Sequence, residues 1–455
     1  MNPVRNFQSE CLSATPNLNT QSPLNISNRM KVLYIATAFP RYEGDIITPW
    51  LVEAVKRLRA KGVDARVFTS SYKGLPSQKI YGINVYRFRY FFKKWETLTH
   101  EETAVDRVKK GFLNKLLVPF YMLFGTVRIT LHCLRNKYDI IHTHWPLPHA
   151  VFGYVASKTG KAKHVLYFHG VELMWVKKEL PFLKPFLRWA IKSADAVMCN
   201  SSHTASRIKE IYNREINIIP SGQSAKPEIE PADIEPLKPK TSAEKNILFV
   251  GRLVERKGVK YLIEAVAKIR NEIDAKENIE TTDYTDSRKK SVKSVKSVVT
   301  KVSIVGTGPE MEPLKQLAEE LGVKDKVDFL GQVSPNELDR CYRNADVFVL
   351  PAVIDAKGDT EGLGVVLIEA LTYKLPVIAT GVGGIVDIIK DNETGVLVQE
   401  KDAEALAKAL LKVLKDDKYA TSLGEKGYQF VNTKYNWDTI TNQIINLFTS
   451  TLSPK

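Results

Sequence analysis

The feature that most constrains the fold is an alternation of strand-like and helix-like segments that occurs twice along the chain. In the first half, KVLYIATAFP precedes TPWLVEAVKRLRAKG, which has apolar residues at helical spacing, and VDARVFTS follows. In the second half, NILFVGRL and GVKYLIEAVAKIR restart the same order. Strand, helix and strand in succession are typical of a parallel sheet. The sequence therefore predicts an α/β protein with two doubly wound domains facing a central cleft, and ligands at the carboxyl ends of the strands.

Segments of unusual composition divide the chain. The first 29 residues are polar and contain no long apolar run, the break between the two alternations is rich in proline and charge, and a later segment repeats SVK. Such compositions favour linkers and disorder. The predicted division is a disordered lead at 1–29, a first domain at 30–222, a linker at 223–245, a second domain at 246–435 with a disordered insertion at 277–300, and a helix at about 436–455 that returns to the first domain.

Charge is distributed unevenly between the two halves. Residues 30–220 hold 31 Lys and Arg against 14 Asp and Glu, whereas residues 221–455 hold 33 against 36. The first half is therefore expected to meet an anionic surface or substrate. Nucleic acid is not the expected partner, because the basic residues are scattered singly and no zinc-finger or RRM signature is present.

Residues 109–138 combine a largely apolar run with basic ends. Pro119 and Arg128 inside this run argue against a membrane-spanning helix. Two interpretations stay open: a helix that lies on an anionic membrane surface, and an ordinary helix that covers the sheet.

Cysteine usage favours a reducing compartment. The chain has four cysteines, which lie far apart without a CxxC pair or a histidine cluster. Neither a disulfide framework nor a zinc site is predicted. A cytoplasmic protein is expected, with the cytoplasmic face of the membrane as an alternative location.

Two loops of the second half carry candidate phosphate-binding groups. Arg252 and Lys257 follow the first strand of this half in VGRLVERKG, where a guanidinium and an ammonium can hold a diphosphate. Gly306 and Gly308 in VGTGPE provide a tight turn with free backbone amides. The alternatives are a solvated basic loop and a purely structural turn.

The segment EGLGVVLIEA places two acids, Glu361 and Glu369, around seven uncharged residues. We expect a helix here, with the amides of Gly362 and Gly364 near its start. Eight residues at 1.5 Å each put the carboxylates about 12 Å apart on one face. This spacing matches the two hydroxyl-bearing ends of a sugar nucleotide, and carboxylates accept hydrogen bonds from hydroxyls.

Taken together, these motifs resemble the nucleotide-sugar half of glycosyltransferase family 4, retaining enzymes of the GT-B fold. The resemblance runs through GRLVERKG, VGTGPE, FLGQVSPNEL, ADVFVLPA, EGLGVVLIEAL and PVIATGVGGIVDII, and covers nearly all of residues 245–400. It implies that Arg252 and Lys257 stabilise the departing diphosphate, that Glu369 binds ribose and that Glu361 binds the donor sugar. The other donor-binding residues that it implies are Gly306, Gly308, Val333, Gly362, Leu363 and Gly364.

The first half resembles the family more loosely. His169 in YFHG resembles the histidine that reaches the donor sugar or the acceptor, and His142 and His144 in IIHTHW stand on the acceptor side. Gly44 and Asp45 in FPRYEGD occupy the place of a glycine-rich loop near the phosphates. A core histidine is the alternative for His169, and a second glycine is replaced by Asp45.

The resemblance implies a retaining transfer of a sugar from a UDP- or GDP-linked donor to a glycan or a lipid-linked acceptor. No metal and no further cofactor are expected, because the two cations can replace a divalent ion. The pathway suggested is that of surface polysaccharide or glycolipid. The alternatives are a sugar-nucleotide epimerase or a glycosyl phosphorylase on the same scaffold, a non-catalytic sugar-nucleotide sensor, and an NAD-dependent dehydrogenase, for which the glycine fingerprint is missing.

Overall fold

The computed structural model describes residues 30–45, 47–100, 104–222, 244–282 and 299–453, and all structural statements below concern these residues. The predicted lead at 1–29 lies outside them, as do residues 223–243 of the predicted linker and residues 283–298 of the predicted insertion.

The first domain is built on an eight-stranded sheet in the order β3-β4-β2-β1-β5-β6-β7-β8. Every neighbouring pair is parallel except β3 and β4. The strands are β1 Lys31–Ile35, β2 Asp64–Ser70, β3 Gln78–Ile80, β4 Ile83–Phe88, β5 Ile140–His144, β6 Lys163–Phe168, β7 Ala196–Cys199 and β8 Asn217–Ile218. The helices are α1 Pro49–Ala60, α2 Ala104–Lys109, α3 Phe112–Arg135, α4 Pro146–Gly160, α5 Val171–Lys178, α6 Lys184–Ser193 and α7 Ser202–Ile211.

The second domain is built on a parallel six-stranded sheet in the order β11-β10-β9-β12-β13-β14. The strands are β9 Glu244–Val250, β10 Val299–Val305, β11 Val327–Gly331, β12 Val347–Leu350, β13 Val377–Thr380 and β14 Val396–Val398. The helices are α8 Val259–Thr282, α9 Met311–Glu320, α10 Pro335–Asn344, α11 Val365–Thr372, α12 Ala403–Lys415 and α13 Asp417–Lys434, and the chain then continues into α14 Trp437–Leu452.

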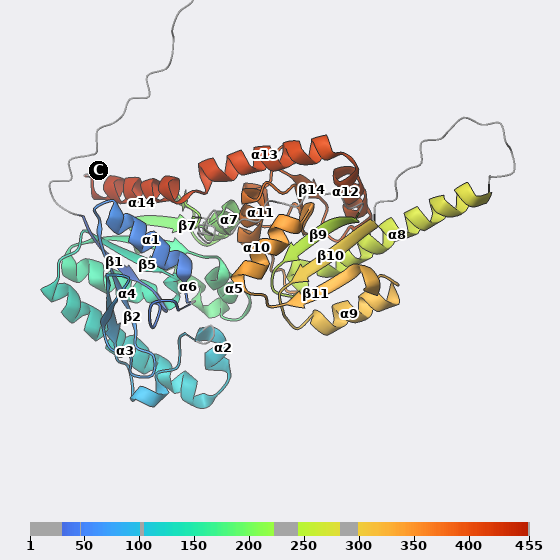
Figure 1. The fold of residues 1–455 in the computed structure, drawn as a ribbon. Helices are drawn as coiled ribbons and strands as arrows, with labels where there is room; N and C mark the ends of the chain where they lie inside the picture. Colours follow the sequence, from blue (N-terminus) through green and yellow to red (C-terminus); the bar gives the residue numbers. More distant parts are fainter. Residues whose placement is uncertain (1–29, 46, 101–103, 223–243, 283–298, 454–455) are drawn as a thin grey trace, which may run out of the picture.

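Continuous apolar runs explain why the central strands lie between helical layers. All four residues of β12 and all four of β13 are buried. Strands that are buried on both faces are typical of a parallel sheet covered by helices on each side. The structure therefore confirms the predicted α/β class with two doubly wound sheets, which form the left and right parts of the molecule in Figure 1.

The end of the chain crosses from the second domain to the first. In Figure 1, α13 runs along the second domain and α14 continues over the first. Trp437, Ile440, Ile444 and Phe448 of α14 are buried in the same cluster as Val32 and other residues of the first sheet. Trp437 packs in this core.

Two predicted boundaries are wrong at their ends. Helix α8 runs on to Thr282 and β10 begins at Val299, so both ends of the predicted disordered insertion 277–300 have regular structure. Strand β9 begins at Glu244, inside the predicted linker 223–245.

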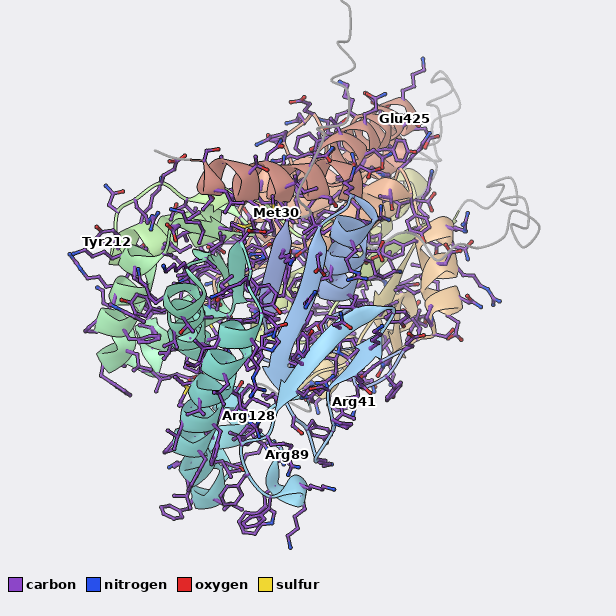
Figure 2. All side chains as sticks on the ribbon, turned by 90° about the vertical axis from the view of Figure 1, so that its left-hand side faces the viewer. Met30, Arg41, Arg89, Arg128, Tyr212 and Glu425 are labelled. Atoms are coloured by element: carbon purple, nitrogen blue, oxygen red, sulfur yellow. The ribbon has the colours of Figure 1, made fainter. Side chains whose placement is uncertain are left out.

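Helix α3 covers one face of the first sheet and has a long outer face. Its residues Leu117, Tyr121, Gly125, Ile129 and Cys133 are buried. Figure 2 shows this helix along the outside of the domain, with Arg128 on its surface. The predicted helix in 109–138 therefore exists, and its inner face covers the sheet.

Candidate active site

The loops that follow β9 and β10 pack against each other through glycines. The amide of Gly251 donates to the carbonyl of Val305 at 3.0 Å. A Cβ at Gly306 would collide with the carbonyl oxygen of Gly251, and a Cβ at Gly308 with that of Leu253. Gly306 also has φ +128°, which L side chains rarely adopt. These two glycines therefore hold the loops together at the carboxyl edge of the second sheet.

A buried ion pair lies beside these loops. The Lys257 Nζ atom is 2.5 Å from Glu361 Oε2, and the two side chains are only 10% and 13% exposed. Arg256 Nη1 lies 3.5 Å from the same oxygen, and Arg256 Nε lies 3.6 Å from Asp359 Oδ2. Burial opposes ionisation of Glu361, but the attraction and hydrogen bond of Lys257, with help from Arg256, lower the pKa of its carboxyl. Two cations, Lys257 and Arg256, therefore face the carboxylates of Glu361 and Asp359.

Helix α11 starts later than the sequence predicts. It begins at Val365, and Gly364 precedes it with φ +86°. Glu361 therefore lies in a loop, and the predicted 12 Å spacing along one helical face is wrong. The amide of Gly384 donates to the carbonyl of Glu361 at 3.0 Å, and a Cβ at Gly383 would collide with that carbonyl. This second pair of glycines supports the loop that presents Glu361.

Glu369 lies on α11, about one turn from the start of the helix, and accepts a hydrogen bond from a tyrosine. The Tyr342 hydroxyl donates to Glu369 Oε2 at 2.9 Å. Burial raises the pKa of the Glu369 carboxyl, although this hydrogen bond offsets part of the effect. Tyr342 is itself fixed by stacking on Tyr373, with ring centroids 4.9 Å apart. One oxygen of Glu369 is therefore engaged within the protein.

The other donor-side candidates differ in exposure. Arg252 is exposed and makes no ion pair with another described residue. Leu363 is buried, whereas Gly362 has open space where a Cβ would be. Val333 is partly buried against the second core. Of the two predicted phosphate-binding cations, Lys257 is paired with Glu361 and Arg252 has no carboxylate partner among the described residues.

In the first domain, His169 is held among aromatic rings. It follows β6, and its Nε2 atom lies 3.1 Å from Nδ1 of His144. The indole of Trp145 stacks on it, with centroids 4.4 Å apart and planes 24° apart, and Trp50 lies 5.0 Å away. The His169 amide donates to Glu172 Oε1 at 2.8 Å. Ring and backbone of His169 are therefore both fixed.

Burial sets the protonation of this group. It lowers the pKa of His169 to about 3 and raises the pKa of Glu172 to about 7. Because both shifts follow from desolvation, the charged forms of the two groups are disfavoured. At neutral pH the histidine is uncharged and the carboxyl is close to its midpoint.

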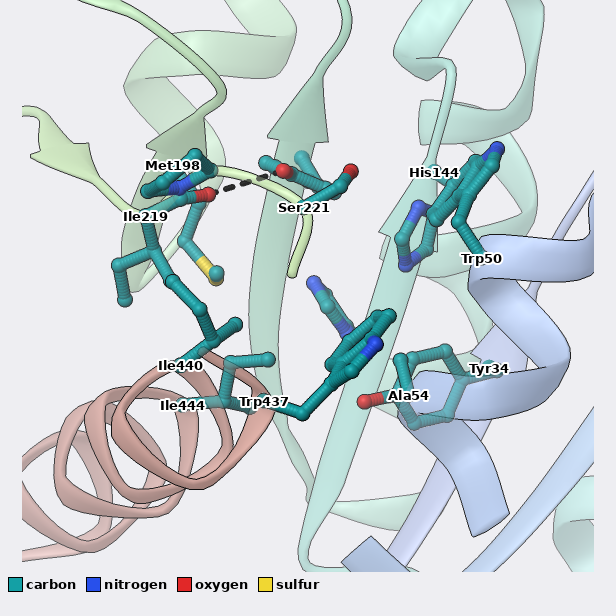
Figure 3. A pocket seen from close by; sticks show the side chains of 13 residues that line it. Tyr34, Trp50, Ala54, His144, Met198, Ile219, Ser221, Trp437, Ile440 and Ile444 are labelled. Carbon is teal, nitrogen blue, oxygen red and sulfur yellow. Dashed lines mark hydrogen bonds between the residues drawn. The ribbon is translucent and has the colours of Figure 1, made fainter. Parts of the chain in front are cut away.

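A small cavity lies behind these histidines. Figure 3 looks into it, with Ile440, Ile444 and Trp437 of α14 on one side and Trp50 and His144 on the other. Among the described residues, the buried lining atoms without a hydrogen-bond partner are Tyr34 Oη, His142 Nδ1, His142 Nε2, His144 Nε2 and Trp437 Nε1. These polar atoms are buried behind the cavity wall, whose accessible lining is apolar. His142 and His144 face this interior rather than open solvent.

Asp45 is engaged by a neighbouring arginine. Arg41 binds it through Nε at 2.7 Å and Nη2 at 3.0 Å, and this hydrogen-bonded pair lowers the pKa of the Asp45 carboxyl. Gly44 has φ +92° and donates its amide to the Tyr81 hydroxyl at 2.5 Å. The loop is thus fixed by its own side chains.

Polar contacts bring the loops of the two domains together. Asn200 donates its side-chain amide to the carbonyl of His169 at 3.4 Å. Two residues on, the Ser202 amide donates to Asp387 Oδ2 of the second domain at 2.7 Å. Arg207 reaches the carbonyl of Gly358 at 3.2 Å. The His169 loop and the loops around Glu361 therefore meet at the same junction.

Sequence reasoning missed four residues that shape this site. Arg256 directly precedes Lys257, and Asp359 lies two residues before Glu361, so a local signal exists for both. The sequence signal for Glu172 is its place shortly after the His-Gly pair. Tyr342 has no local signal, because its partner Glu369 lies 27 positions away. Within the described residues, no group of three or more His, Cys, Asp or Glu side chains could hold a metal ion.

Solved structures share the fold of this chain. A glycosyltransferase from Rickettsia africae superposes with a TM-score of 0.66 at 19% identity, covering 94% of this chain and 100% of that one. Sucrose-phosphate synthase from Thermosynechococcus elongatus gives 0.64 at 21% identity, covering 93% and 99%. These likenesses confirm the GT-B fold, two Rossmann-like domains that face each other.

Sequence relatives and family models identify the family. A GDP-mannose-dependent alpha-(1-6)-phosphatidylinositol monomannoside mannosyltransferase from Mycobacterium tuberculosis is 29% identical over 324 residues, which are 69% of this chain and 77% of the relative. N-acetyl-alpha-D-glucosaminyl L-malate synthase from Bacillus anthracis is 25% identical over 69% of this chain and 75% of the relative. The model for Glycosyltransferase Family 4 matches residues 50–224, and that for Glycosyl transferases group 1 matches residues 233–430. The chain belongs to glycosyltransferase family 4 and is a glycosyltransferase.

Proposed function

We propose that this enzyme transfers a sugar, with retention of anomeric configuration, from a UDP- or GDP-linked donor to a glycan or lipid-linked acceptor. The observation that carries the proposal is the buried Lys257–Glu361 pair with Arg256 beside it, at the carboxyl edge of the second sheet. Support for a lipid-linked acceptor comes from the mycobacterial relative, whose name states a phosphatidylinositol monomannoside substrate.

The donor would bind along the second domain. Lys257 has three protons on Nζ and uses one for Glu361, which leaves two for diphosphate oxygens. Exposed Arg252 would supply a bidentate clamp from the same loop. Glu361 would accept from the sugar hydroxyls and Glu369 from the ribose, with backbone contacts from Gly306, Gly308, Gly362, Leu363 and Gly364 and a base contact from Val333.

Catalysis would follow from where charge develops. Breaking the bond between the anomeric carbon and phosphate leaves negative charge on the diphosphate and positive charge on the ring. Lys257 and Arg252 would stabilise the first, and no divalent ion is then required. His169, neutral and fixed by His144 and Glu172, would offer a hydrogen bond to the sugar or the acceptor. Gly44 would approach the phosphates from the first domain, with Asp45 held by Arg41.

The proposal also covers organisation and location. Residues 30–222 with the helix at about 436–455 would act as the acceptor-side domain, and 246–435 as the donor domain. We place the enzyme in the cytoplasm, in surface polysaccharide or glycolipid biosynthesis. The mycobacterial relative supports the glycolipid assignment.

The test is a thermal-shift panel of UDP-, GDP-, ADP- and TDP-sugars on metal-free protein in EDTA. Glu369→Gln removes a carboxylate while keeping the volume, and Glu393→Gln, on an exposed turn, is the matched control. We expect one nucleotide sugar to raise Tm for the wild type and the control, and a much smaller rise for E369Q relative to its own unliganded Tm.

Acceptor screening with that donor then tests the reaction, with the anomeric configuration of the product read by NMR. Stabilisation by NAD(H) and by no nucleotide sugar would refute the proposal. Activity that disappears in EDTA and returns with magnesium would refute metal independence alone.

A further inference from the structure

The outer face of α3 is unusually apolar for a surface helix. Its length and composition would suffice to cross a membrane, and 28% of its most apolar window is buried. Phe112 is 81% exposed, and Leu123 and Leu134 are each 58% exposed. The other exposed large apolar side chains of α3 are Leu113, Leu116, Phe124, Val127 and Leu131. Contiguous exposure on this scale marks an interaction surface.

The exposed residues form a stripe with basic edges. At about 100° per residue, the side chains of Phe112, Leu116, Leu123, Val127 and Leu134 fall within an arc of about 60°. On the same wheel, Lys115 lies on one side of this stripe and Arg128 and Arg135 lie on the other. No Asp or Glu occurs between Phe112 and Arg135. The outer face therefore pairs an apolar strip with uncompensated positive charge.

A neighbouring turn extends the same surface. The 3-10 helix η1, Lys93–Trp95, follows Phe92, which is 72% exposed. Phe91 joins this turn to α3, because its ring centroid lies 5.1 Å from that of Phe120. Lys93 and Lys94 are exposed beside it. Aromatic and basic side chains together are typical of the interface between lipid and water.

The inner face of α3 prevents the helix from crossing a bilayer. Tyr121 and Ile129 belong to a buried cluster of the first domain, and a Cβ at Gly125 would collide with the Phe152 ring. Insertion across a membrane would remove these residues from the core. A second copy of the chain is also a poor occupant, because two such stripes face to face would bring Lys and Arg edges together without an acid on either helix.

We propose that the outer stripe of α3, with the Phe92 turn, docks the enzyme flat on an anionic lipid bilayer. The apolar side chains enter the boundary between headgroups and acyl chains, and Lys115, Arg128 and Arg135 contact anionic headgroups. This orientation is independent of donor and acceptor, so the test needs no substrate.

The test is co-sedimentation of the full-length protein with sucrose-loaded vesicles, either pure phosphatidylcholine or phosphatidylcholine with phosphatidylglycerol. Two double variants probe the surface: Phe92→Ser with Leu123→Ser, and Lys115→Glu with Arg128→Glu. Their matched controls are Leu321→Ser, exposed at the end of α9, and Lys418→Glu with Lys426→Glu on exposed positions of α13. Circular dichroism and unliganded Tm establish that each variant is folded.

We expect the wild type and both controls to bind anionic vesicles, with weaker binding to neutral ones and at high salt. The charge variant should lose binding by about tenfold or more, since each basic side chain near an anionic surface is worth about fivefold. The apolar variant should also lose about tenfold or more, since burial of one large apolar side chain is worth about that much. Equal binding of wild type and α3 variants would overturn the proposal. So would a wild type that stays in the supernatant, or one that forms dimers through this face in sedimentation velocity while ignoring vesicles. None of these outcomes bears on the nucleotide-sugar test.

Discussion

The most consequential residue-scale feature is the Lys257–Glu361 pair, because each side chain needs the other when no donor is bound. Removing one partner from a nearly buried ion pair leaves an uncompensated charge, which destabilises far more than the pair itself stabilises. Arg256 remains at 3.5 Å and compensates part of that charge. The pair therefore couples the donor loop after β9 to the loop before α11.

Lys257→Met should lower the free energy of unfolding of the second domain by about 2–3 kcal/mol. The measurement is urea denaturation at pH 7.5. Adding Glu361→Gln should recover part of the loss, because the buried charge then disappears. Lys260→Met is the control, since Lys260 lies 3.7 Å from Glu264 on the exposed face of α8 and should cost about 0.5 kcal/mol or less. Equal losses for the two lysines would contradict the buried-pair explanation.

Burial of Glu172 should make the stability of the protein depend on pH. Its pKa is raised from 4.5 to about 7 by burial. Between these pH values the unfolded chain loses this proton and the folded chain keeps it, so this group lowers stability as pH rises. Glu172→Gln removes the titration. The stability of the variant relative to wild type should therefore increase by up to about 3 kcal/mol from pH 4.5 to 7 and then level off.

Urea unfolding of both proteins at pH 5, 6, 7 and 8 checks this prediction. Other groups titrate alike in the two proteins, so their contributions cancel in the difference. A stability difference that stays constant over this range would show that Glu172 is already ionised in the folded state. Replacement by Gln keeps an oxygen for the His169 amide, which limits the structural effect of the change.

At the scale of elements, sequence patterns predict strands and helices better than they predict contacts. The alternation of apolar strands and amphipathic helices predicts both sheets. The start of α11 is predicted four residues too early, although Gly364, a residue suited to a helix cap, stands directly before Val365. In a parallel sheet the loops that follow the strands lie at the same edge. Motifs placed directly after predicted strands therefore indicate where the site lies.

Pairings within the site could not be predicted in this way. Lys257 and Glu361 are 104 positions apart, and their contact depends on how β9 and β12 lie in one sheet. His144 and His169 meet because β5 and β6 are adjacent. Arg41 and Asp45, four positions apart, are the exception that local spacing could have indicated.

Two loop glycines differ in the space available for a side chain. Gly308 lies against the Leu253 carbonyl, whereas Gly362 has nothing within 4 Å of a built Cβ, and neither needs a positive φ. Gly308→Ala should cost about 2 kcal/mol or more through overpacking, and Gly362→Ala about 0.5 kcal/mol or less. Urea unfolding of the two variants measures the difference. Similar stabilities would mean that the loops after β9 and β10 separate at little cost.

At the scale of the whole molecule, the C-terminal helix makes the two domains unequal. The first core includes Trp437, Ile440, Ile444 and Phe448 of α14. Among the described residues, the second core contains no residue that follows Tyr435 in the sequence. Burial of each large apolar side chain stabilises by about 1.5–3 kcal/mol. The four together match the whole stability of a typical domain, about 5–15 kcal/mol.

A chain that ends at Asn436 should therefore lose the first domain and keep the second. Limited proteolysis should leave a resistant fragment that begins near β9, and thermal unfolding should lose the transition that belongs to the first domain. A chain that ends at Leu452 is the control and should unfold like the full protein. If the shorter chain kept the unfolding transitions of both domains, α14 would not be required for the stability of the first core. The helix would then serve another purpose, such as limiting how far the two domains open at the Ser202–Asp387 contact.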